Sequence, residues 1–154
     1  MQGPPVAIRD FDPRDQDSVR RLVLEGLRER WGETFEDGRN PDLDDIADTY
    51  VHAGAEVVVA ERGGQIVGTG TLLPVGEGCA RIVRMSVDRR CRREGVARRV
   101  VMELVDRARA RGMREVLVST DTPWTSAVDL YRSCGFVEVG RDETDTHLRM
   151  QLAT

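Results

Sequence analysis

A basic segment between an apolar run and a periodic helix most constrains how this chain can fold. The apolar run covers residues 80–87, and the arginine-rich segment 89–99 follows it and contains Gly95. A strand that turns at a glycine and continues as a helix directs several backbone N–H groups, and the positive end of the helix dipole, to one point. The sequence therefore predicts a phosphate-binding turn between a strand and a helix.

Length and composition are those of one globular domain. With 154 residues, of which 40% are hydrophobic, the chain is long enough to bury a core, and we expect a single domain over residues 1–154. We expect no membrane span and a cytoplasmic protein, because no long apolar run and no charged-then-apolar leader is present. Cys79, Cys91 and Cys134 are odd in number and lack CxxC spacing, which argues against disulfides and a metal site.

Charge is unevenly distributed along the chain, although the net charge is only −4. The segment 32–56 is acidic and the segment 81–99 is basic, so the first suits a cationic partner and the second an anionic one. A nucleic-acid partner is disfavoured. Acids flank the basic segment, no aromatic residues are interleaved with it, and the pI is about 5.3.

Periodicity and turn residues in the first half predict one strand, two helices and a three-stranded meander. Residues 5–10 alternate as a strand does, and Asp12 followed by Pro13 marks the start of an amphipathic helix. Residues 42–52 have the pattern of a second, acidic helix. Three β-rich runs, separated by glycine-containing turns, complete this half: 56–60, 65–73 and 80–87.

The second half begins with the most strongly periodic element of the sequence. Its apolar side consists of Ala97, Val100, Val101, Leu104, Val105 and Ala108. Gly112 ends this helix, a strand is expected over 115–120, and a short helix over 125–134 is closed by Gly135. Two strands, 136–141 and 147–152, give the order β-α-α-β-β-β-α-β-α-β-β.

This order, together with two motifs, resembles the GCN5-related N-acetyltransferase (GNAT) family over nearly the whole chain. Arg92-Arg93-Glu94-Gly95-Val96-Ala97 matches the acetyl-CoA signature Q/R-x-x-G-x-G/A, and residues 127–136 match A-x-x-L-Y-x-x-x-G-F. The resemblance implies an α+β fold with three layers, α/β/α. Its sheet is mixed, mostly antiparallel and of about seven strands, with four helices.

The resemblance also implies a reaction and a cofactor site. The expected activity moves an acetyl group from acetyl-CoA, as cosubstrate, to a primary amine of a small molecule or protein by direct transfer in a ternary complex. Amides of the basic turn hold the pyrophosphate, and the implied positions are Arg92, Arg93, Glu94, Gly95, Val96, Ala97 and Arg98. Splayed strands leave main-chain groups of Met85, Ser86 and Val87 for the pantetheine arm, and the Met85 N–H polarises the thioester carbonyl.

Tyr131, in the second motif, is the candidate general acid. A thiol has a pKa of about 8.5 and a tyrosine about 10, so a phenol can protonate the departing thiolate. The alternative is a core aromatic, since Tyr131 has helical spacing from Ala127 and Leu130.

The general base is left open by the sequence. Some histone-acetylating members of the family place a glutamate near the start of the fourth strand, where this chain has Arg81, which argues against a direct carboxylate base. Glu77, His52, Asp121 and a water relay are the alternatives, and His147 is expected to be structural.

Three residues are candidates for acceptor binding. Glu33 belongs to the acidic stretch on the segment that walls the acceptor cleft in this family; the alternative is a solvated helix face. Arg84, inside an apolar strand, needs a carboxylate, either from the protein or from an amino-acid-like substrate. Trp124 replaces an asparagine frequent in the family and either covers the acyl group or fills core space.

A non-catalytic acyl-CoA-binding sensor is the alternative function, because the cofactor signature is better preserved than any base. Exposed edges of the expected sheet leave a homodimer open.

Overall fold

The computed structural model describes residues 5–32 and 40–152. Its strands are β1 (Ala7–Asp10), β2 (Glu56–Arg62), β3 (Gln65–Gly76), β4 (Cys79–Val87), β5 (Glu115–Asp121), β6 (Val137–Arg141) and β7 (Asp145–Gln151). The α-helices are α1 (Gln16–Trp31), α2 (Val96–Ala110) and α3 (Thr125–Ser133). Four short helices are η1 (Pro13–Asp15), η4 (Pro41–Leu43), η5 (Ala47–Val51) and η6 (Arg89–Cys91). The predicted order of elements is confirmed.

The strands form one sheet in the order β1-β2-β3-β4-β5-β7-β6. Only the β4–β5 pair is parallel, and the other neighbours are antiparallel. The β2–β3 hairpin turns at Gly63 and Gly64, whose φ angles are both positive, as a two-residue type I′ turn requires. The predicted mixed sheet is therefore confirmed.

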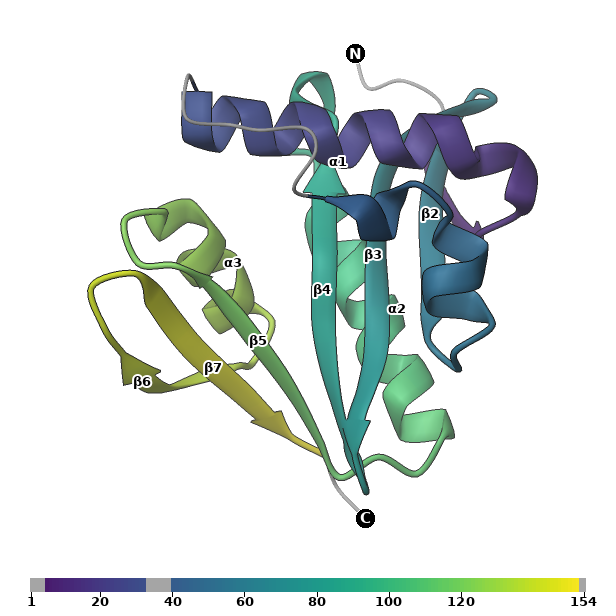
Figure 1. The fold of residues 1–154 in the computed structure, drawn as a ribbon. Coiled ribbons are helices and arrows are strands. Elements are labelled where there is room, and N and C mark those ends of the chain that lie inside the picture. Colours follow the sequence, from purple (N-terminus) through teal and green to yellow (C-terminus); the bar gives the residue numbers. More distant parts are fainter. Residues whose placement is uncertain (1–4, 33–39, 153–154) are drawn as a thin grey trace.

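Helices cover both faces of the sheet and make three layers. α1 and η5 lie on one face, over a core that includes Val19, Leu43 and Val59, whereas α2 and α3 pack on the other. Figure 1 shows α1 crossing in front of β3 and β4, with α2 behind them. The apolar side of α2 is buried there, as in Val100 and Leu104, except for Ala97, which is partly buried. The three-layer architecture that the family resemblance implied is confirmed.

β4 and β5 part soon after they meet. Their pairing covers three residues of each strand and ends at Arg81 and Leu117. Beyond this point the strands diverge toward α1, as Figure 1 shows. We call this region the β4–β5 opening.

The predicted helix over 42–52 is irregular in the structure. It consists of the 3-10 helix η4 and the π-helix η5. The Gln16 side chain accounts for the irregularity, because its Nε2 donates to the Leu43 carbonyl at 2.7 Å and its Oε1 accepts from the Ile46 N–H at 2.9 Å. The Gln16 amide thus hydrogen-bonds a carbonyl and an N–H group that would otherwise form hydrogen bonds within a regular helix. The apolar side survives, since Leu43, Ile46 and Tyr50 are buried.

No helix within the described residues is long and apolar enough to cross a membrane.

Candidate functional site

A bulge in β4 shapes one wall of the β4–β5 opening. Gly70 of β3 faces two residues of β4, Arg84 and Met85, and Arg84 has a φ of +54°. A Cβ at Gly70 would lie 2.5 Å from the Met85 sulfur and 2.9 Å from Val100 Cγ1 of α2, so a larger residue there would displace both side chains. The bulge turns Arg84 toward α1 while Met85 packs with the core under α2. Ser86 follows Met85, and its hydroxyl donates to the Leu22 carbonyl of α1 at 3.1 Å.

The turn between β4 and α2 has the backbone that the sequence predicted for an anion site. Gly95, at the N-cap of α2, has a φ of +81°, and Arg93 has a φ of +65°. A Cβ at Gly95 would meet no atom within 4 Å, so glycine is needed for the conformation and one side of the turn is open. No side chain caps α2, which leaves its first N–H groups for an anion.

The arginines of this turn have different partners. Arg92 makes two hydrogen bonds to Glu29 of α1, at 2.5 and 2.6 Å. Arg98 donates to the carbonyl and hydroxyl oxygens of Ser133 in α3, at 2.8 and 3.1 Å. Among the described residues no ion pair engages Arg93, so its charge is available to a ligand. A cavity of about 590 Å³ borders the turn on its α1 side and is lined by residues that include Gly26, Val87 and Arg92.

Tyr131 lies in the core under the opening. Its ring is 4% exposed and meets Phe136 edge-on, with 5.6 Å between ring centroids. Burial raises the pKa of Tyr131, a charge on Cys134 raises it further, and the Arg30 cation opposes both. The hydroxyl makes no hydrogen bond within the described part of the chain. Tyr131 is thus a core aromatic whose hydroxyl proton is not engaged by the described residues, and its role as general acid stays a prediction.

Arg30, which the sequence did not single out, bridges α1 to the far side of the opening. Its Nη1 donates to Asp121, at the end of β5, at 2.8 Å, and its guanidinium carbon lies 3.5 Å from the centroid of the Trp124 ring. Trp124 is the N-cap residue of α3 and is partly buried. Its ring therefore lies at the opening rather than in the core. Glu33, which the sequence also offered for acceptor binding, lies outside the described residues.

The carboxylate that Arg84 needs comes from the protein. Arg84 makes two hydrogen bonds to Asp42, at 2.9 and 2.7 Å, and the Tyr50 hydroxyl donates to the same carboxylate at 2.6 Å. Burial alone would raise the pKa of Asp42, but the hydrogen bonds from Arg84 and Tyr50 hold it below its ordinary value. This cluster ties the segment after α1 to the bulge of β4.

The candidate general bases lie in different parts of the fold. Glu77 is in the β3–β4 turn, at the paired end of the strands, and His52 follows η5, which packs on β2. Asp121 is at the opening, where Arg30 binds its carboxylate. His147 is on β7. The structure therefore removes Glu77 and His52 from the candidates.

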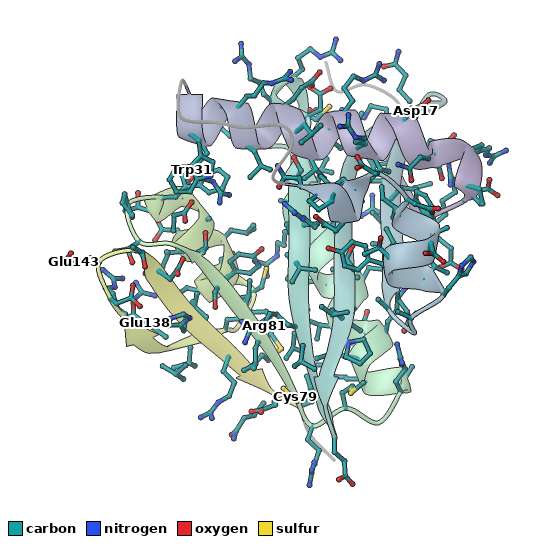
Figure 2. All side chains as sticks on the ribbon, viewed as in Figure 1. Asp17, Trp31, Cys79, Arg81, Glu138 and Glu143 are labelled. Carbon is teal, nitrogen blue, oxygen red and sulfur yellow. The ribbon has the colours of Figure 1, made fainter. Side chains whose placement is uncertain are left out.

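A polar group that the sequence did not reveal lies on the α1 face beside the opening. Figure 2 shows Arg81 between β4 and β5, near their paired ends. Its Nη1 donates to the Ser119 hydroxyl at 3.0 Å, and the same hydroxyl lies 2.7 Å from the His147 Nδ1. No sequence signal connects these three residues, because strand pairing alone brings them together.

Comparisons with known proteins agree with this geometry. A sequence model of the acetyltransferase (GNAT) family matches residues 21–136. N-acetyltransferase family 8 member 2 of Rattus norvegicus is 36% identical over 104 residues, which cover 64% of this chain and 46% of that protein. The chain thus spans about half the length of the curated relatives it matches.

Two solved structures share the fold. An acetyltransferase of the GNAT family from Staphylococcus aureus Mu50 superimposes with a TM-score of 0.88 at 17% identity, over 97% of this chain and 100% of that one. The PaiA N-acetyltransferase of Thermoplasma acidophilum, in complex with coenzyme A, gives 0.85 at 11% identity, over 96% and 99%. With the family model covering well over half of its length, the chain belongs to the acetyltransferase (GNAT) family.

Proposed function

We propose that this chain moves an acetyl group from acetyl-CoA to a primary amine of a small molecule or protein, by direct transfer within a ternary complex. The observation that carries the proposal is the uncapped N-terminus of α2, which begins at Gly95 at the edge of the β4–β5 opening. The names of the relatives, which are N-acetyltransferases, support an amine as the acceptor.

The turn before α2 binds the pyrophosphate of coenzyme A. Backbone N–H groups from Arg93 to Arg98 supply the positive field, together with the Arg93 side chain, which no ion pair engages among the described residues. Each such contact contributes about 0.3–2 kcal/mol, so several act together. Arg92 is held by Glu29 and keeps the turn in place rather than binding the ligand with its side chain.

The wall of β4 holds the pantetheine arm. β4 pairs with β3 on one side, so the main-chain groups of Met85, Ser86 and Val87 on the other side face the opening. The Met85 N–H, beside the bulge, polarises the thioester carbonyl. Bound acetyl-CoA supplies the acetyl group. A bond forms from the amine nitrogen to the carbonyl carbon, and the carbon–sulfur bond breaks. The acetyl group thereby takes the place of one hydrogen on the amine nitrogen.

Tyr131 supplies the proton that the departing sulfur takes up. Burial raises the pKa of its phenol, so the acid is protonated at neutral pH. Attack by the neutral amine leaves a positively charged nitrogen, and the tyrosine regains its proton from this nitrogen as the neutral amide forms, so the reaction balances. Arg30, whose charge favours the phenolate, limits the cost of this transfer.

The acceptor enters from the α1 face. The other face is filled by the core under α2 and α3. Trp124 and the Asp42–Arg84 pair lie on the entry side, and the acidic character of the segment around Asp42 suits a cationic amine.

A non-catalytic acyl-CoA sensor is the second candidate. It is favoured by the engagement of Asp121, the carboxylate at the opening, by Arg30. A sensor and an enzyme both bind coenzyme A, but only the enzyme releases free thiol when an amine is present.

The test measures coenzyme A binding and the release of free thiol. Calorimetry with coenzyme A and acetyl-CoA is expected to detect binding to the wild type, weakened about tenfold or more in Arg93→Glu, which corresponds to about 1.4 kcal/mol. Arg14→Glu is the matched control, because Arg14 is an exposed arginine at the far end of α1. Thiol release with acetyl-CoA and a panel of amines identifies an enzyme. Binding without release with any amine favours the sensor, and no binding refutes both.

A further inference from the structure

Four polar side chains form a connected group on the α1 face, next to the β4–β5 opening. Arg81 Nη1 donates to Ser119 Oγ at 3.0 Å, Ser119 Oγ lies 2.7 Å from His147 Nδ1, and His147 Nε2 lies 3.8 Å from Asp142 Oδ2. The register of the sheet brings them together, since Ser119 pairs directly with His147. They come from β4, β5, β7 and the turn before β7.

One arrangement of protons connects all four groups as a relay. An arginine side chain can only donate, so Ser119 Oγ accepts from Arg81 and can direct its own hydrogen to His147 Nδ1. In this arrangement the imidazole carries its proton on Nε2, the nitrogen that faces Asp142. The serine oxygen then has one lone pair left. A hydrogen-bond donor arriving from the opening can use it.

The group lies on the acceptor side of the opening. β4 and β5 separate after Arg81 and Leu117, and Ser119 is two residues further along β5, with its side chain exposed. Asp121, which Arg30 binds, follows at the same face about 6.6 Å further along the strand. Ser119 and Asp121 therefore lie on the β5 wall of the opening, and Met85 lies on the facing β4 wall.

Acetyl transfer needs such a proton acceptor. An alkylammonium group with a pKa of about 10.4 is neutral in only about one molecule in 2,500 at pH 7, a cost of roughly 4.6 kcal/mol. Among the described residues, Asp121 is bound by Arg30, and Arg81 stands where a carboxylate would act.

We propose that His147, acting through Ser119, receives the proton that the acceptor's ammonium group must lose. The inference rests on the proposed acetyl transfer. An N–H bond of the ammonium breaks and its electron pair stays on nitrogen; the proton moves to Ser119 Oγ while the serine's own proton moves to His147 Nδ1. The His147 side chain is 44% exposed, so water takes the proton from the imidazolium and resets the relay.

The surrounding charges act on both ends of the relay. Hydrogen bonds from the N–H of Asp145 and from Thr144 lower the pKa of Asp142 to about 2, so its carboxylate is ionised at neutral pH and lies 3.8 Å from His147 Nε2. Arg81, on the other side of Ser119, places a positive charge next to the site of the ammonium group, which favours loss of the ammonium proton. The remaining charged residues that alternation places on this face near His147 are Asp145 and Arg149 on β7 and Glu115 on β5, which pairs with Arg149 at 3.9 Å. Across from His147, β6 presents Gly140.

The first test needs no activity. The chain has two histidines, so His52→Gln leaves His147 as the only one, and its ring nitrogens can be assigned by ¹⁵N NMR. The relay predicts that neutral His147 carries its proton on Nε2 and that Ser119→Ala changes the Nδ1 resonance. A proton on Nδ1 in the neutral ring overturns the proposal, whether or not the protein transfers acetyl groups.

The second test is kinetic. His147→Gln is expected to lower kcat/KM at neutral pH about tenfold or more and to remove the acidic limb of its pH profile, with coenzyme A binding unchanged. Ser119→Ala is expected to do the same, and Ser119→Thr, which keeps the hydroxyl, to retain the rate. His52→Gln is the matched control. A wild-type profile in His147→Gln refutes the relay, whereas absence of thiol release by the wild type refutes the proposed function instead.

Discussion

The guanidinium carbon of Arg30 lies 3.5 Å from the centroid of the Trp124 ring. This contact and the ion pair with Asp121 attach the last turn of α1 to the β5 side of the opening. The preceding residue, Glu29, binds Arg92 in the turn after β4. Two adjacent residues of one helix thus hold the two sides of the opening, and the distance between those sides depends on α1.

The Arg30–Asp121 pair is expected to be energetically coupled. The two side chains are only 24% and 19% exposed, so solvent screens them less than a surface pair. A double-mutant cycle with Arg30→Met and Asp121→Asn should give a coupling free energy of unfolding of about 1–2 kcal/mol in urea titrations. The matched cycle uses Arg20→Met and Asp44→Asn, a pair at 3.4 Å that is 38% and 66% exposed, and should give about 0.5 kcal/mol or less. Equal couplings would contradict the bridging role.

Gly95 and Gly64 offer a matched pair of substitutions. Both have a φ of +81°, and a Cβ at either would meet nothing within 4 Å. Alanine should therefore cost each variant about 1–2 kcal/mol of stability, through the left-handed backbone alone. Only Gly95→Ala should also weaken coenzyme A binding, by about tenfold in calorimetry, because Gly95 sets the direction of the N–H groups of α2. Equal affinities in the two variants would place the pyrophosphate elsewhere.

Tyr131→Phe separates the two roles of this residue. The ring still packs against Phe136, so coenzyme A affinity and melting temperature should change little. Loss of the phenolic proton should lower kcat about 100-fold. An unchanged kcat would leave Tyr131 as a core aromatic only.

The pH dependence of the wild-type rate gives a second check on Tyr131. Burial raises the pKa of Tyr131 above the ordinary value of 10.0, and a general acid acts below its pKa. The rate should therefore not decline through loss of this proton as the pH rises toward 10. A decline below that pH that disappears in Tyr131→Phe would show a more acidic phenol than the buried site predicts.

Asp42 should stabilise the fold in a pH-dependent way. Burial tends to raise the pKa of its carboxyl, but the Arg84 and Tyr50 hydrogen bonds lower it below the ordinary value of 3.8. A group with a lowered folded-state pKa stabilises above its unfolded value, and this contribution is lost as the pH falls through the folded value. Asp42→Asn should cost about 2–3 kcal/mol at pH 7.

The difference between wild type and Asp42→Asn should shrink as the pH falls from 7 to 3, as measured by urea unfolding. Asp44→Asn is the control, because the Asp44 side chain is 66% exposed and its ion pair with Arg20 is long. A gap that stays constant with pH would mean that the carboxylate charge contributes nothing.

Local patterns in the sequence were enough for most of the fold. The Gly63–Gly64 turn and the apolar side of α2 were predictable because each depends on residues within a few positions of one another. The 42–52 helix shows the limit of such patterns. Its apolar spacing was predicted, but the Gln16 side chain, 27 residues before Leu43, interrupts its hydrogen bonds.

The sequence by itself determined the strand-turn-helix that opens α2, since backbone conformation and helix polarity there follow from Gly95 and its neighbours. Only the tertiary structure decided which polar side chains meet around the β4–β5 opening. Arg84 meets Asp42, Arg30 meets Asp121 and Ser119 meets His147 over separations of 42, 91 and 28 residues. Such pairs form where the sheet register and helix packing bring distant segments together, and no local periodicity encodes them.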